Sequence, residues 1–111
     1  MDLITEIFWV IITYILYVIF ETIFTMLGTK LVKINVELKQ IVVISAIKSI
    51  TYIIFGFVPI FGNLLGIMAA AYLNKDMFDV NWKNGFTIEL PTVVFILIAM
   101  LLSIIFGIVV L

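Results

Sequence analysis

Long apolar runs, separated by two polar segments, dominate this chain, and their lengths predict how often it can cross a membrane. A membrane-spanning helix needs about 20 apolar residues, with a range of about 17 to 25. The runs at 7–27 and 91–111 both satisfy this length. We therefore expect the first and last membrane spans there, with Pro91 in the first turn of the last one, where proline is favoured.

A third apolar run, Ile41 to Leu73, is too long for a single crossing. As one helix it would extend about 50 Å, against a hydrocarbon core of about 30 Å. Residues that interrupt helices and form turns lie at its middle: Gly56, Pro59, Gly62 and Asn63. The run predicts two short helices, 41–57 and 60–73, joined by a Gly/Pro turn. A hairpin that only partly enters the membrane is the alternative.

Composition supports a membrane location. Of 111 residues, 66% are hydrophobic and 12% are charged, against about 25% charged residues in soluble domains, and the mean hydropathy is +1.40. No long polar linker separates a second region. We expect a single domain over 1–111, an all-α integral membrane protein built as a compact bundle of four transmembrane helices, of which the middle two are short.

The lysines predict which way the spans run. With four spans, the polar segments 28–40 and 74–90 lie on one side of the membrane, and the termini lie on the other. Lysine favours the cytoplasmic side, so we expect both segments to be cytoplasmic; with three spans they would lie on opposite sides and the bias would vanish. The lysines in the two segments are Lys30, Lys33, Lys39, Lys75 and Lys83.

Two charges, Glu21 and Lys48, fall inside predicted spans. Each lies seven residues from the cytoplasmic end of its span, which places both at about 10 Å depth on consecutive antiparallel helices. Charged side chains in a bilayer usually face the bundle interior and pair. The pattern predicts an intramembrane ion pair; the alternative is that each side chain reaches separately toward the headgroups.

Small residues recur at helical spacing and predict where helices pack closely, since small faces let backbones approach in a membrane. Gly62 and Gly66 form a GxxxG motif, which Ala70 extends by one turn. We expect packing within the chain or between subunits through these faces. The same spacing relates Ser45 to Ser49 and Ser103 to Gly107.

Aromatic residues among charges predict contacts with the membrane surface. Trp9 lies near the start of the first span and Trp82 lies in the second polar segment, so both are expected to act as interfacial anchors. Asn84 and Gly85 predict a turn. Residues 32–39 alternate apolar and polar types, which is typical of a strand, but an amphipathic surface helix fits equally well.

The order of these segments resembles the Yip family of small multi-span membrane proteins over about 28–111. The resemblance rests on Pro59 and Gly62 in "FVPIFGN" and on Trp82 in "FDVNWKNGF". It implies a role in membrane organisation or trafficking with partner proteins and no catalytic centre. The chain is shorter than is usual for that family.

Several function classes find no support in the composition. Histidine and cysteine are absent and the net charge is -1, so the usual zinc ligands, thiol nucleophiles and a basic nucleic-acid-binding face are missing. We expect no enzyme, no cofactor and no metal site. The favoured function is a membrane structural or interaction protein, in the lipid bilayer, forming a homo-oligomer or binding partner membrane subunits. The alternative is an oligomeric channel, a holin-like pore or a small transporter that uses Glu21 and Lys48.

Overall fold

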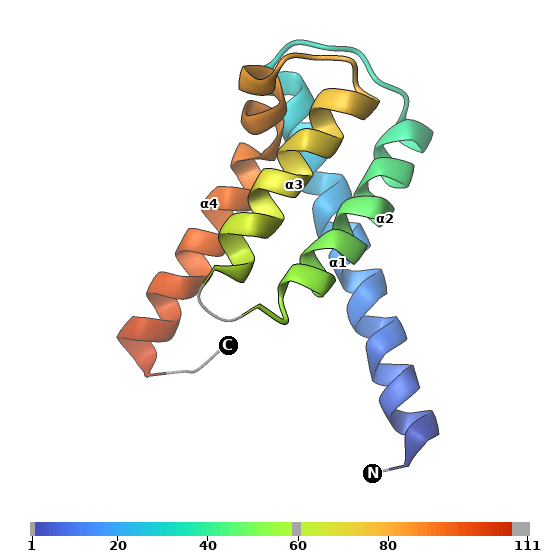
Figure 1. Ribbon diagram of the computed structural model, residues 1–111, viewed down its shortest axis with the longest axis vertical. Helices are drawn as coiled ribbons and strands as arrows, with labels where there is room; N and C mark the ends of the chain where they lie inside the picture. Colours follow the sequence, from blue (N-terminus) through green and yellow to red (C-terminus); the bar gives the residue numbers. More distant parts are fainter. Residues whose placement is uncertain (1, 59–60, 108–111) are drawn as a thin grey trace.

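The protein is a bundle of four antiparallel helices in the computed structural model, which describes residues 2–58 and 61–107 (Figure 1). This confirms the predicted compact, all-helical fold. The start of α1, the end of α2, the start of α3 and the end of α4 lie at one end of the bundle, and the α1–α2 and α3–α4 connections lie at the opposite end. The helices are α1 (Leu3–Leu31), α2 (Leu38–Phe55), α3 (Gly62–Met77) and α4 (Trp82–Phe106).

Three of these helices, α1, α2 and α4, are long and apolar enough to cross a membrane. Helix α3 has 16 residues, or about 24 Å at the usual rise, and is shorter than a hydrocarbon core of about 30 Å. Pro59 and Ile60 of the predicted Gly/Pro turn and residues 108–111 of the predicted last span lie outside the described residues.

Helix α1 begins earlier and ends later than the predicted span. The Asp2 side chain accepts a hydrogen bond from the Thr5 backbone N–H at 2.8 Å, which caps the helix and lowers the pKa of Asp2. At its other end α1 continues through Gly28 to Leu31. The alternation of apolar and polar residues over 32–39 was compatible with a strand or a surface helix. Residues 32–37 form neither, and α2 begins at Leu38.

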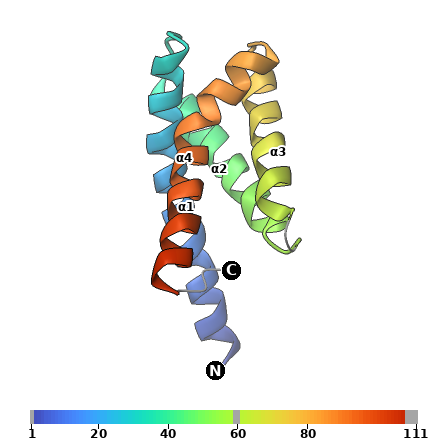
Figure 2. The same cartoon turned by 90° about the vertical axis from the view of Figure 1, so that its left-hand side faces the viewer.

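The predictions for Pro91 and for an Asn84–Gly85 turn were wrong, because α4 begins at Trp82 and contains all three residues. The Asn81 side chain accepts the Asn84 backbone N–H at 2.8 Å and starts the helix. Pro91 lacks an N–H group and so bends the helix rather than starting it. Figure 2 shows the first turns of α4 leaning toward α3, while the remainder lies along α1.

The inside of the bundle is small and polar, and the outside is apolar. Each helix packs against two neighbours in the cyclic order α1, α2, α3, α4. Among the described residues, only Ile41, Ile44 and Ile88 are large apolar side chains that are buried. Most of the other buried positions are Gly, Ala, Ser, Thr or charged residues, whereas most Leu, Ile and Phe side chains are exposed. This arrangement suits an apolar surrounding, in which close packing replaces hydrophobic burial between helices.

Predicted small-residue faces hold α2 and α3 together. Gly62, Gly66 and Ala70 are buried on α3. A Cβ atom on Gly62 would collide with the Phe55 carbonyl oxygen of α2, and one on Gly66 would lie 2.8 Å from the Tyr52 ring. The GxxxG face therefore packs within this chain.

The remaining predicted packing residues divide into two groups. Ser45 and Ser49 are buried in α2, one turn apart. Ser103 donates to the Ala99 carbonyl of its own helix. Gly107 follows α4 with φ 65°, and nothing among the described residues lies within 4 Å of its Cβ position. Gly107 thus ends the helix in a left-handed conformation that glycine adopts readily.

Candidate functional site

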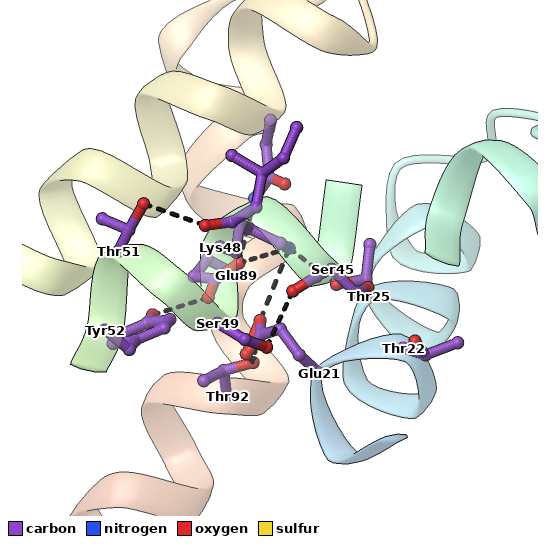
Figure 3. Close-up of polar contacts among 12 residues, drawn as sticks. Glu21, Thr22, Thr25, Ser45, Lys48, Ser49, Thr51, Tyr52, Glu89 and Thr92 are labelled. Atoms are coloured by element: carbon purple, nitrogen blue, oxygen red, sulfur yellow. Dashed lines mark hydrogen bonds and ion pairs between the residues drawn. The ribbon is translucent and has the colours of Figure 1, made fainter. Parts of the chain in front are cut away.

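Lys48 lies at the centre of the bundle and has no exposed surface. Its Nζ atom lies 2.9 Å from Oε1 of Glu89 and 3.4 Å from Oε1 of Glu21. The ammonium group also donates to Oγ1 of Thr25 at 2.6 Å. Figure 3 shows these three partners converging on Lys48 from two other helices. The structure therefore brings together the two residues predicted to pair and adds a second carboxylate.

Glu89, on α4, is the better satisfied of the two carboxylates. It is fully buried. Besides Lys48, its Oε2 accepts the Tyr52 hydroxyl at 2.6 Å and its Oε1 accepts Nδ2 of Asn74 at 3.0 Å. Charge-assisted hydrogen bonds of this length are strong, so Glu89 and Lys48 form a closely satisfied pair that crosses the bundle.

Glu21, on α1, has fewer donors. The Thr92 hydroxyl lies 3.0 Å from its Oε1 and 3.3 Å from its Oε2. Its contact with Lys48, at 3.4 Å, is longer than the contact between Lys48 and Glu89. Glu21 is therefore the carboxylate that the protein leaves less satisfied.

All four helices contribute to this cluster, which we call the charge cluster. It consists of three charged residues and the polar side chains that bind them directly: Glu21, Thr25, Lys48, Tyr52, Asn74, Glu89 and Thr92. Burying charges is costly and is recovered only through good geometry and further hydrogen bonds. Because each helix supplies at least one member, the cluster fixes the relative position of all four.

Sequence reasoning missed Glu89, because it was assigned to the polar segment before Pro91. A signal was present in the spacing of the small and polar residues around it. Gly85, Ile88, Glu89 and Thr92 are the buried residues of α4, and they follow one helical face through Pro91. If this face of the last helix had been assigned to the interior of the bundle, Glu89 would have been predicted to face Lys48.

The charge cluster contains two carboxylates and one ammonium group. If both carboxylates are ionised, the cluster carries one negative charge, which is expensive within a membrane. Asn74 also has a buried Oδ1 atom with no hydrogen-bond partner among the described residues. Its amide orientation is fixed because Nδ2 donates both to Glu89 and to the Gly85 carbonyl. With both carboxylates ionised, one additional positive charge would make the cluster neutral.

A half-open cavity of about 1100 Å³ lies beside the charge cluster, in the half of the bundle nearer the termini, and several of its lining side chains, such as Phe20 and Phe95, are also exposed on the outside of the bundle. Glu21, Ser49, Tyr52 and Thr92 supply polar groups to its wall, and Lys48 and Glu89 do not line it. Most of the remaining wall is aromatic or aliphatic. Glu21 is therefore the charged residue that connects the cluster to the cavity.

The two predicted anchors lie away from this cluster on the outside of the bundle. Trp9 is exposed on α1, beside Phe8. Trp82 is the first residue of α4, where Nζ of Lys75 lies 5.7 Å from its ring centre. The described residues contain no group of three or more acidic, histidine or cysteine side chains placed to hold a metal ion.

Nothing matches this chain in comparisons with protein-family models, curated proteins and solved structures. The resemblance to the Yip family therefore stays a prediction from the sequence.

Proposed function

We propose that this chain is a small multi-pass membrane transport protein, in which Glu21 is the intramembrane binding group. The observation that carries the proposal is the position of Glu21, which belongs to the buried charge cluster and also lines a cavity of about 1100 Å³. Ionisable residues inside a membrane are expensive, and they commonly mark substrate or proton pathways. This favours the transporter alternative over a purely structural role.

The proposed topology has four spans, with the connections at 32–37 and 78–81 in the cytoplasm and the termini on the other side. Three helices have the length and apolarity for a crossing, and α3 packs antiparallel between α2 and α4. Both connections lie at the same end of the bundle, and the lysine bias favours the cytoplasm for that end.

A structural or interaction protein is the second candidate. The observation that favours it is the broad apolar outer surface, which lipid or partner helices would cover. The Gly62, Gly66 and Ala70 face does not support it further, because that face is already packed within the chain. Both candidates are non-enzymatic, and the Yip-family resemblance agrees better with this second one.

Flux measurements in liposomes test the transport proposal. Purified protein is reconstituted with a pH-sensitive dye inside, and proton movement is followed under an imposed membrane potential. We expect protein-dependent proton flux that falls at least about tenfold in Glu21→Gln, because the neutral amide cannot carry the proton or counter-charge.

Glu37→Gln is the matched control, since Glu37 is exposed in the connection before α2. It should leave the flux unchanged. Flux equal to that of empty liposomes, or flux that Glu21→Gln leaves intact, would contradict the proposal and leave the structural candidate.

A further inference from the structure

We propose that the cavity beside Glu21 binds an amphiphilic organic cation, with the Glu21 carboxylate as its counter-charge. The inference rests on the proposed transport function for its physiological meaning, but the binding itself can be measured without transport. Four features of the described residues support it: the charge of the cluster, the aromatic wall, the size of the cavity and its apolar lining.

The charge of the cluster favours a cation. Nζ of Lys48 lies 2.9 Å from Glu89, and the distance from Nζ to Glu21 is longer, at 3.4 Å. Since one ammonium group faces two carboxylates, one negative charge is left without a counter-charge when both are ionised. Only Glu21 of the two lines the cavity, so a cation placed there would complete the charge balance.

The wall next to Glu21 is aromatic. Phe20 and Phe24 of α1 and Phe95 of α4 all line the cavity and contact one another, with ring centres 5.2 to 6.3 Å apart. Tyr52 lies on the opposite helix pair and lines the same space. Aromatic faces attract cations electrostatically and bind organic cations without removing a tightly held hydration shell.

The size and lining of the cavity argue for an organic molecule. Its volume of about 1100 Å³ is slightly above the range of about 300–1000 Å³ that is typical of small-molecule sites. Such sites are mainly apolar with a few polar groups that orient the ligand. Here Glu21, Ser49 and Thr92 supply the polar end, whereas a bare metal ion would find too few oxygen ligands among them.

A proton on Glu21 would also balance the charge of the cluster. It would need neither the aromatic wall nor a cavity of this size, so it explains less of the structure. A proton and an organic cation would compete for the same carboxylate. This competition predicts that the cation binds more weakly as the pH is lowered, because protonation removes the negative charge that attracts it.

Equilibrium binding to the full-length protein in lipid nanodiscs tests the inference. The probe is tetraphenylphosphonium, a lipophilic cation, and empty nanodiscs give the membrane background. The comparison ligand is tetraphenylborate, an anion of the same shape, which needs no change to the protein. We expect saturable binding of the cation and no saturable binding of the anion.

Two variants locate the site. Glu21→Gln should weaken cation binding at least about tenfold, and Phe95→Leu should weaken it by a smaller factor. Phe106→Leu is the control, because Phe106 is exposed and does not line the cavity. Should Glu21→Gln fail to fold, the comparison of the two ions and the Phe95 variant still decide.

Equal binding of cation and anion, no saturable binding of the cation, or unchanged affinity in Glu21→Gln would each overturn the inference. The two proposals can fail separately. Cation binding without any flux in liposomes would leave the binding site and remove the transport function, whereas Glu21-dependent proton flux without cation binding would do the reverse.

Discussion

Lys48 is the residue whose surroundings are most unusual, because a lysine side chain with no exposed surface normally requires a paired charge. Its ammonium group has a carboxylate from α4, a carboxylate from α1 and a threonine hydroxyl within 3.4 Å. Removing this one cation would leave Glu21 and Glu89 facing a space without positive charge.

We therefore expect Lys48→Met to destabilise the protein by about 3–5 kcal/mol, the usual cost of breaking a buried ion pair by removing one partner. Thermal or denaturant unfolding in detergent micelles measures it. Lys39→Met is the control, because Lys39 is exposed near the start of α2 and should change stability by less than about 0.5 kcal/mol. Equal stability of the two variants would mean that the charge cluster contributes little.

Exchanging the charges of Glu21 and Lys48 should not restore stability. Glu21→Lys with Lys48→Glu would bring the new glutamate close to Glu89, where like charges repel. We expect this double variant to be as unstable as either single one, and the addition of Glu89→Gln to recover part of the loss. Full recovery by the exchange alone would show that Glu89 does not take part in the cluster.

The contact between Glu21 and Lys48 could be predicted from the sequence. Helical rise alone placed the two charges at one depth, and this estimate needs no tertiary information. Glu89 was missed, because Pro91 and the neighbouring polar residues suggested that the helix had not yet started, and the spacing of Gly85, Glu89 and Thr92 was not used. The cap at Asn81 starts α4 earlier, and a proline bend lets it continue past Glu89.

At the scale of helices, glycines set the distance between neighbours. Gly28 of α1 faces Ile88 of α4, and a Cβ atom on Gly28 would collide with the Ile88 carbonyl oxygen. Backbone atoms cannot turn aside as a side chain can, so the two helices would have to separate. Both Glu21 and Glu89 depend on this contact, since they lie on the same two helices within about two turns of it.

Gly28→Ala should therefore destabilise the bundle by about 1–3 kcal/mol or more, as overpacking usually does, despite a gain of about 1 kcal/mol in helix propensity. Unfolding in detergent gives the free energy. Gly56→Ala serves as the milder comparison, because its nearest atoms would be 3.2 Å away. A Gly28→Ala variant more stable than the native protein would show that α1 and α4 are not in close contact.

The length of each run predicted the number and order of the helices well, because apolar length is a property of the chain itself. The ends of the helices were harder to predict from the sequence. α1 continues to Leu31 and α4 begins at Trp82, nine residues before the expected start at Pro91, since caps and contacts with neighbouring helices decide these positions. The bundle also differs from a soluble protein, in which apolar side chains are buried and polar ones are exposed. Here most buried side chains are small or polar, and most large apolar side chains are exposed.

At the scale of the whole molecule, the antiparallel arrangement makes a definite prediction for sidedness. The chain lacks cysteine, so single cysteines report one position each. We expect Asn35→Cys and Asp76→Cys, both exposed, to react with a membrane-impermeant reagent from the cytoplasmic side, and Asn63→Cys to react only from the other side.

Lysine bias and helix order together give this expectation. Reaction of Asn63→Cys from the cytoplasmic side would show that α2 and α3 form a hairpin that does not cross, and the protein would then have only two full spans. Reaction of Asn35→Cys and Asp76→Cys from opposite sides would instead indicate three spans.

The order in which the three buried charges enter the membrane follows from their positions in the chain. Glu21 and Lys48 lie on α1 and α2, so the first hairpin can insert with its two charges already matched. Glu89 arrives later on α4 with Asn74 of α3 as a hydrogen-bond partner, and it meets Lys48 only when the second hairpin docks on the first. Because an unmatched carboxylate is costly in lipid, docking and insertion of the second hairpin should be coupled. A fragment that ends after α2 should therefore insert more readily than one that contains α3 and α4 alone.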